Sequence, residues 1–293
     1  MIPKIERGRS AGAYYTRLKY KPGWEQYFLL VSDIHYDAIG CDRKLIKKHL
    51  DQAVERNAGI FLLGDTVDLM QGKKDKRAAK HALRPNYMFD DYLGAVMEDA
   101  AKFLAPYAKN IMFISQGNHE LGYKKHHEID PLSILATHIK ADTGIRPIIA
   151  PYTGWMQFKC EFDSGTGGRR KTVRLKYHHG TGTGGAVVTK GAINSNRAVS
   201  MAEADVYVRG HIHTRFSMQM PYERISANGT IIEDQNRIYL QTGCYVTDYK
   251  NGDSWSQQRG FGSPALGGYW LRLYCDNTSD PNRLIKYIAY PTD

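Results

Sequence analysis

Short apolar runs recur along the first two thirds of the chain and give the first indication of its fold. Each run is rich in β-branched and aromatic residues and is too short for a helix. This pattern is typical of strands that are covered on both faces in a layered α/β protein. We predict five such strands, at residues 27–31, 60–63, 111–114, 173–177 and 206–208.

Two segments between these runs have the spacing of amphipathic helices. Residues 43–57 carry an apolar stripe, and Asp42 stands where it can cap the first turn. Residues 90–104 carry a second stripe, which is followed by Pro106. Helices therefore alternate with the first strands.

Three later segments also have strand-like patterns and predict a second sheet that packs on the first as a layer. They are residues 238–241, 269–274 and 284–289. Residues 249–268 are rich in Gly, Ser and Gln, so we expect an irregular loop there, with a further loop insertion near 69–90. We interpret residues 1–293 as a single domain.

Polar residues follow all five of the first strands. In α/β proteins the loops beyond the carboxyl ends of strands converge and bind ligands, so one shared site is expected. In chain order these residues are Asp33 and His35, Asp65 and Asp68, Asn118 and His119, His178 and His179, and His211 and His213.

The residue types in these blocks indicate a metal centre. Asp and Asn supply oxygen ligands and His supplies imidazole nitrogen, a mixture suited to Mn²⁺, Fe or Zn²⁺. Each block alone has an ordinary explanation, such as a tight turn at Gly64-Asp65 or a polar loop at Gly117-Asn118. Five blocks at successive strand ends are explained more simply by one shared metal site.

The order of the blocks resembles the pattern of the calcineurin-like metallophosphoesterase family, which runs D-x-H, GD-x-x-D, GNH-D/E, H and GH-x-H. All five blocks are present between residues 27 and 215. The resemblance implies a four-layer α-β-β-α sandwich, in which two mixed β-sheets are flanked by helices. It also implies a dinuclear metal centre at one edge of the sandwich.

The resemblance further implies how the two ions are held. Asp65 would bridge them, because a shared carboxylate and a shared hydroxide offset the repulsion between cations about 3.5 to 4 Å apart. We expect Mn²⁺, with Fe, Zn²⁺ or Ni²⁺ as alternatives. The implied ligands are Asp33, His35 and His213 for one ion and Asn118, His179 and His211 for the other.

Two further roles follow from the same resemblance. His119 would protonate the leaving oxygen during in-line attack on phosphorus, and Asp68 would accept its other N–H and fix its tautomer. His178 and His179 are adjacent, so on a strand they point to opposite sides and only one can bind. We assign His179, which directly precedes Gly180 as the ligand commonly does in the family.

The charge of the chain favours a polyanionic partner. Lys and Arg number 40 against 30 Asp and Glu, which gives a net charge of +10 and a pI near 9.3. Basic residues cluster at 73–80 and at 169–171. The alternative is a scattered, solvated basic surface without a nucleic-acid partner.

The segment after Asp68 bears on the substrate. Leu69-Met70-Gln71 stands where protein phosphatases of the family carry Arg-Gly, and the missing arginine would have gripped a phosphomonoester. We therefore predict a phosphodiesterase that acts on DNA or RNA, like a nuclease. The alternatives are a cyclic-nucleotide or small-molecule phosphodiesterase, a phosphomonoesterase, and a non-catalytic binding platform, against which the intact His119 argues.

Cysteine use and the N-terminus bear on the compartment. The four cysteines are far apart and form no CxxC spacing, which indicates reduced thiols. The N-terminal segment lacks the apolar region of a signal peptide, and no apolar stretch approaches the roughly 20 residues of a membrane span. We expect a cytoplasmic protein without a membrane partner.

Overall fold

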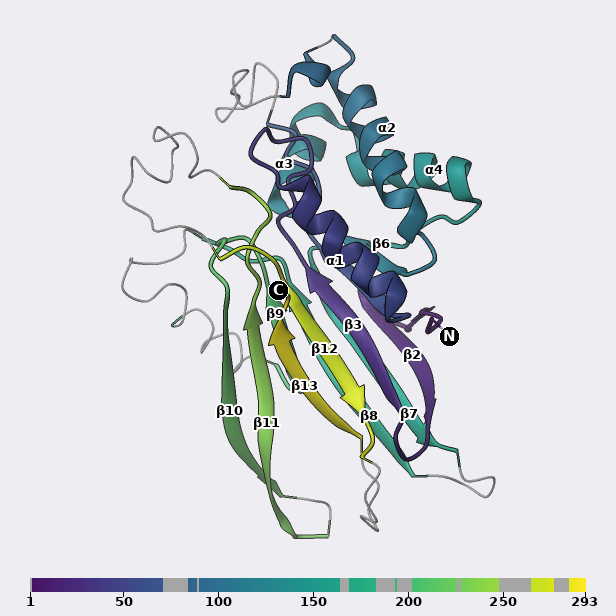
Figure 1. Cartoon of the computed structure of the whole chain (residues 1–293). Helices are drawn as coiled ribbons and strands as arrows, with labels where there is room; N and C mark the ends of the chain where they lie inside the picture. The colour runs from purple at the N-terminus through teal and green to yellow at the C-terminus, as the bar shows by residue number, and fades with distance from the viewer. Residues whose placement is uncertain are drawn as a thin grey trace.

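A computed structural model describes residues 2–70, 84–88, 90–163, 169–182, 193, 202–225, 228–247, 265–276 and 285–293 of the chain. Two β-sheets pack face to face, and helices lie over one of them (Figure 1). The basic cluster at 73–80 lies outside the described residues, as do most of the segments 69–90 and 249–268.

One sheet has six strands in the order β13-β12-β3-β4-β5-β6. The strands from β3 to β6 are parallel, whereas β12 is antiparallel to β3 and β13 is antiparallel to β12. Their bounds are β3 Glu25–Val31, β4 Gly59–Leu63, β5 Ile111–Ser115, β6 Ile149–Ala150, β12 Tyr269–Tyr274 and β13 Lys286–Pro291.

The other sheet has seven strands in the order β1-β2-β7-β8-β9-β11-β10. β7 is parallel to β2 and antiparallel to β8, and β9 is parallel to both β8 and β11. The bounds are β1 Glu6–Arg7, β2 Ala13–Tyr20, β7 Thr153–Phe162, β8 Arg170–His178, β9 Val206–Arg209, β10 Phe216–Ile225 and β11 Ile231–Gln241.

The facing sides of the two sheets form an aromatic core. Phe28 of β3, Phe61 of β4 and Phe158 of β7 are fully buried, and the ring centroids of Phe28 and Phe158 lie 4.5 Å apart. Side chains alternate along β3, so Phe28 packs toward the other sheet and Leu29 packs toward the helices. A strand that is apolar throughout is therefore buried on both faces.

Within the described ranges, three helices pack on the outer face of the six-stranded sheet, and a fourth lies beside them. Asp42, Asp91 and Asp130 cap α1, α2 and α4, each accepting a hydrogen bond from the backbone N–H three residues on. No described helix is long and apolar enough to cross a membrane. The helices are α1 Arg43–Glu55, α2 Tyr92–Leu104, α3 Asn118–His127 and α4 Pro131–Thr143, with 3₁₀ turns η2 Pro85–Tyr87 and η3 Ala105–Tyr107.

The predicted sandwich of two mixed sheets with flanking helices is confirmed, but several strands belong to a different sheet from the one predicted. β12 and β13 extend the sheet of β3, so the prediction that they belong to a second sheet is wrong. β8 and β9 lie in the seven-stranded sheet together with β11. A helical layer over the seven-stranded sheet remains a prediction.

Candidate metal centre

The five loops that follow β3, β4, β5, β8 and β9 meet at one end of the sandwich. Figure 1 shows the arrowheads of β3 and of β11, which is parallel to β9, pointing toward that end, one from each sheet. Backbone hydrogen bonds tie the loops together: Asp33 N donates to Gly64 O at 3.0 Å, and Gly210 N donates to His179 O at 2.8 Å. The carboxyl ends of strands from both sheets therefore build one site.

Asp33, His35 and His213 form the first group of donor atoms. The Nε2 atoms of His35 and His213 lie 3.2 Å apart, and Nε2 of His213 lies 3.4 Å from Asp33 Oδ1. Asp33 and His35 are buried, whereas the His213 side chain is 37% exposed. The cluster therefore opens to solvent on the side of His213.

Asp65, Asn118, His179 and His211 form the second group. Asn118 Oδ1 lies 3.0 Å from His179 Nε2 and 2.7 Å from His211 Nδ1. Donor atoms of Asp65, His179 and His211 all lie within 4.8 Å of one another, as do those of the first group. The seven residues that the family pattern names as ligands are thus brought together in space.

Asp65 lies between the two groups. Its Oδ2 is 4.0 Å from His35 Nε2 on one side and 3.0 Å from His179 Nε2 on the other. Its Oδ1 accepts a hydrogen bond from the backbone N–H of His119 at 3.0 Å. One carboxylate can therefore serve both groups while its other oxygen is held by the protein.

The backbone is turned sharply at the donor residues. Asp and His tolerate the left-handed region better than most residues, yet such conformations remain uncommon and tend to gather at functional sites. The turns direct side chains from different loops toward one point. Five donor residues have positive φ: Asp33 at 53°, His35 at 47°, Asp65 at 50°, His211 at 76° and His213 at 52°.

Hydrogen bonds behind the site set the tautomers of two donor histidines. His179 Nδ1 lies 2.9 Å from the carbonyl oxygen of Leu63, which can only accept, so Nδ1 carries the proton. His35 Nδ1 lies 2.8 Å from Asp68 Oδ1, a carboxylate oxygen that also accepts, so this Nδ1 carries the proton as well. In the neutral imidazoles both Nε2 atoms then point a lone pair into the site, which is the arrangement of metal-ligating histidines.

The charges of the site attract positive charge. Burial alone would lower the pKa of His179, but the nearby carboxylates of Asp65 and Asp33 outweigh it and raise the pKa to about 9. Burial likewise opposes protonation of His35, yet its hydrogen bond to Asp68 and the charge of Asp65 raise its pKa to about 9. The same field would stabilise bound cations.

The residues present fit divalent cations. Ligand atoms of imidazole, carboxylate and amide groups converge at separations of 2.7 to 3.4 Å, close enough to share a bound cation. The mixture of nitrogen and oxygen donors suits Mn²⁺, Fe, Zn²⁺ or Ni²⁺. Asp33, His35 and His213 would hold one ion, and Asn118, His179 and His211 the other, with Asp65 between them.

Glu120 is a residue of the site to which the sequence analysis gave no role. It is buried on α3, and its carboxylate accepts four backbone N–H groups, from Gly117 at 2.8 Å, Asp65 at 3.1 Å, Thr66 at 2.7 Å and Val67 at 3.3 Å. It therefore ties the loop after β4 to the loop after β5. The signal was present, since Glu120 is the last residue of the GNHE block.

Asp37 holds the rest of the same loop. Its buried carboxylate accepts the backbone N–H of Asp68 at 2.5 Å and of Leu69 at 3.1 Å, and it also accepts the hydroxyl of Tyr92 on α2. Together with Glu120, it satisfies every backbone N–H from Asp65 to Leu69. The segment that carries Asp65 and Asp68 is thus fixed by two carboxylates that reach it from different elements.

His119 and Asp68 lie together, but their contacts differ from the expected pair. His119 Nδ1 is 2.6 Å from the backbone carbonyl of Asp68 and 3.4 Å from its carboxylate, while the carboxylate is closer to His35. The carbonyl oxygen fixes the tautomer of His119 and leaves Nε2 facing inward, 3.8 Å from Asp65 Oδ2. Asp68 therefore supports His119 mainly through its backbone.

His178 lies beside the site and not in it. Its Nδ1 accepts the backbone N–H of Gly180 at 2.9 Å, and its ring packs edge-on against Tyr152. Burial, followed by the positive charge of Arg209, lowers the pKa of His178 to about 4. The neighbouring His179 is fully buried among the donor atoms.

No family model and no curated protein sequence matches the chain. Solved structures that are similar to it include three at 12% identity. They are a protein of Thermotoga maritima solved by NMR (TM-score 0.33, covering 91% of this chain and 99% of that one), a metallophosphoesterase from Sphaerobacter thermophilus (0.36, 92% and 88%) and GAP50, the anchor in the inner membrane complex of Plasmodium (0.41, 90% and 88%).

Proposed function

We propose that this protein is a phosphoester hydrolase that uses two divalent cations, with Mn²⁺ as the preferred pair, and that it cleaves phosphodiesters of nucleic acid. The observation that carries the proposal is the pair of donor groups that share Asp65. Bound there, the cations would activate a water molecule and offset charge that develops on the phosphoryl oxygens.

The chain's own residues supply the other parts of such a reaction. His119 has its Nδ1 held by the Asp68 carbonyl, and its side chain is 11% exposed, so Nε2 can reach a substrate at the surface of the site. A histidine fixed in this way suits proton donation to a leaving oxygen. Asp65 and Asn118 hold their positions through the loop that Glu120 ties together.

Two features support phosphodiesters of nucleic acid over monoesters. No arginine stands in the segment 69–71 after Asp68, where it would grip the extra charge of a monoester. The net charge of +10 favours association with a polyanion.

The test is hydrolysis of bis-p-nitrophenyl phosphate and p-nitrophenyl phosphate by the same preparation, with Mn²⁺ and with EDTA. We expect cleavage that depends on Mn²⁺ and favours the diester. Faster cleavage of the monoester would support a phosphomonoesterase, and no cleavage by metal-loaded protein would support a binding platform on the same fold.

A further inference from the structure

A second feature lies beside the metal centre. Residues 7–14 form a hairpin turn that, with Gln116 and residues 149–151, lines a hollow of about 480 Å³. We call it the Arg7–Arg9 hollow. Its volume is within the range of sites that take a nucleotide-sized ligand.

The lining of the Arg7–Arg9 hollow is basic and polar. Arg7 and Arg9 are exposed, Ser10 and Gln116 add hydrogen-bonding groups, and no acidic residue is among the described residues that line it. Among the described residues, neither guanidinium forms an ion pair, whereas the exposed guanidinium of Arg17 on the next strand pairs with Glu6 at 3.4 Å. Unpaired arginines around a hollow are suited to binding phosphate groups.

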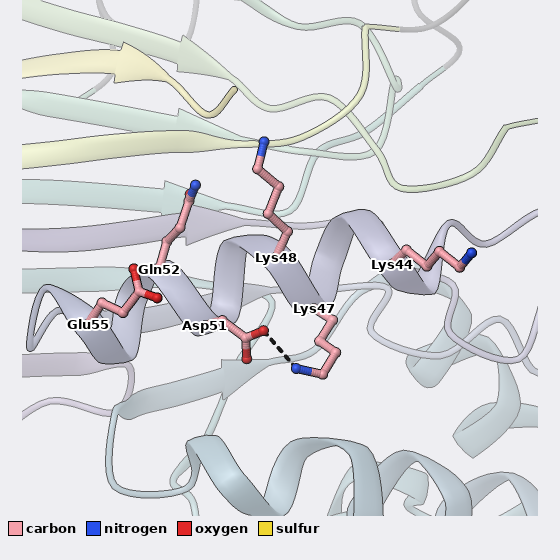
Figure 2. Close-up of a pocket in the computed structure, with 6 residues that line it drawn as sticks. All are labelled: Lys44, Lys47, Lys48, Asp51, Gln52 and Glu55. Atoms are coloured by element: carbon pink, nitrogen blue, oxygen red, sulfur yellow. Dashed lines mark hydrogen bonds and ion pairs between the residues drawn. The ribbon is translucent and has the colours of Figure 1, made fainter.

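A second hollow on the surface differs from the Arg7–Arg9 hollow in the charge of its lining. Figure 2 shows the residues that line a hollow along α1, where Lys44, Lys47 and Lys48 are followed by Asp51 and Glu55. Its volume is about 450 Å³. Lys47 is paired with Asp51 at 2.7 Å. We call this the α1 hollow. Its positive and negative charges largely balance along one helix, so it should bind a polyanion much more weakly than the Arg7–Arg9 hollow does.

The walls of the Arg7–Arg9 hollow continue into segments of the metal centre. Gln116, whose N–H donates to Ala150 O at 3.0 Å, stands two residues before Asn118. Pro151 precedes Tyr152, whose carbonyl accepts the N–H of His179 at 3.0 Å. Both walls therefore end within one or two residues of the site.

The strand order gives the distance between the two features. Ala13 at the start of β2 pairs with Trp155 of β7, and Thr153 at the start of β7 pairs with His178 at the end of β8. Arg7 on β1 pairs with Tyr14 of β2 and so lies one strand further out. Three strand spacings of about 4.8 Å place Arg7 roughly 14 Å across the sheet from β8. A stacked strand advances about 3.4 Å per nucleotide, so this span is roughly four nucleotides.

We propose that the Arg7–Arg9 hollow is a subsite for phosphates of a polynucleotide strand that flank the bond being cleaved. This inference rests on the proposed function. The two arginines, which form no ion pair with any residue that the structure describes, bind backbone phosphates and hold the strand across the metal centre. The small diester bis-p-nitrophenyl phosphate is too short to reach them.

The test compares the double variant Arg7→Ala/Arg9→Ala with the matched control Lys44→Ala/Lys47→Ala, which removes the same charge from the α1 hollow. Binding of a fluorescein-labelled single-stranded oligodeoxynucleotide is measured by anisotropy over a series of salt concentrations. For the arginine variant we expect affinity lower by about tenfold and a salt slope shallower by about 1.4, the value for two phosphate contacts. The control should remain within twofold of wild type, and Arg7→Lys/Arg9→Lys should recover most of the affinity.

Cleavage by the Mn²⁺-loaded proteins separates this subsite from the metal centre. We expect the arginine variant to raise KM for the oligonucleotide and to leave turnover of bis-p-nitrophenyl phosphate unchanged. Equal losses in both double variants, or unchanged oligonucleotide binding, would overturn the subsite. Loss of bis-p-nitrophenyl phosphate cleavage in the arginine variant would assign the hollow to the reaction centre instead. If wild type cleaves neither substrate, the proposed function fails, while the anisotropy measurement still decides whether the hollow binds the strand.

Discussion

Asp65 lies close to donor atoms of both groups. Its Oδ2 lies 4.0 Å from His35 Nε2 and 3.0 Å from His179 Nε2, and its Oδ1 accepts a hydrogen bond from the backbone N–H of His119. A bridging carboxylate cannot be replaced by an amide, which has lost both the charge and one oxygen. The effect of such a change should therefore reach both ions.

We predict that Asp65→Asn weakens binding of both metal ions together. The expected result is a protein that retains its fold but holds much less than one equivalent of Mn²⁺ after dialysis, measured by atomic emission. Asp51→Asn on the exposed face of α1 is the control and should bind metal normally. Selective loss of one ion would contradict the bridging role.

We predict that His119→Ala retains its metal but loses turnover where the leaving group needs a proton. General acid catalysis contributes about 10²- to 10⁴-fold, so cleavage of an oligonucleotide should fall by that order. Cleavage of bis-p-nitrophenyl phosphate should fall much less, because nitrophenolate leaves without a proton. Equal losses on both substrates at full metal content would remove His119 from the role of acid.

At the scale of elements, the site depends on how loops are held to one another. Glu120 on α3 accepts backbone N–H groups from two loops, and Asp37 accepts the remaining ones of the loop after β4. Gly117 is needed at this contact, since a Cβ there would overlap the Asp65 carboxylate. The donor atoms are thus positioned by backbone contacts as much as by their own side chains.

We predict that Glu120→Gln weakens metal binding without removing any donor atom. Only the oxygen of the glutamine amide can accept hydrogen bonds, whereas its NH₂ group donates, so part of the loop from Asp65 to Val67 loses its partners. Changes of this kind typically cost about 10- to 100-fold in metal affinity. Competition with a fluorescent chelator measures the affinity, with Glu98→Gln, an exposed residue of α2, as the control. Wild-type metal affinity in Glu120→Gln would show that the hydrogen bonds from the two loops to Glu120 are dispensable for metal binding.

The sequence predicted elements well where the pattern is local. The strands β3, β4, β5, β8 and β9 and the helices α1 and α2 were all expected close to their observed bounds. The helix α4 was missed although Asp130 and Pro131 mark its start and Leu132, Leu135 and Ile139 give its buried stripe. β7 was missed because it alternates buried and partly buried residues and contains no continuous apolar run.

Sheet membership could not be predicted in this way. The apolar pattern of β12 shows that its residues are buried, but its partner β3 lies more than 200 residues earlier, as in the pair Tyr269 and Leu30. A side-chain pattern sets the face of a strand and says nothing about which neighbour pairs with it. For the same reason the sequence placed the donor residues at strand ends and did not reveal that the strands come from two sheets.

At the scale of the whole molecule, the buried carboxylates of the site destabilise the metal-free fold. Asp33, Asp37, Asp65, Asp68 and Glu120 are all buried within one region. Burial and the charge of Asp65 raise the pKa of Glu120 to about 7. Bound cations would offset this charge, so metal binding should stabilise the fold by mass action.

We predict that the metal-free protein loses stability as pH rises from about 6.5 to 9. His35 and His179 have folded-state pKa values of about 9, above the 6.5 of the unfolded chain, so their stabilisation is complete below pH 6.5 and is lost as pH rises through 9. The slope should reach about 1.4 kcal/mol per pH unit for each proton. Urea unfolding in EDTA at several pH values measures it, and a flat profile would contradict the assignment. Saturating Mn²⁺ should remove most of the slope.

The most direct test of the central claim is electron paramagnetic resonance of the protein loaded with Mn²⁺. Two ions that shared Asp65 would lie about 3.5 to 4 Å apart, close enough for their electron spins to couple. We predict two equivalents of bound Mn²⁺ and a spin-coupled spectrum that Asp65→Asn abolishes. A six-line spectrum of isolated Mn²⁺, or a single equivalent at saturation, would contradict a dinuclear centre.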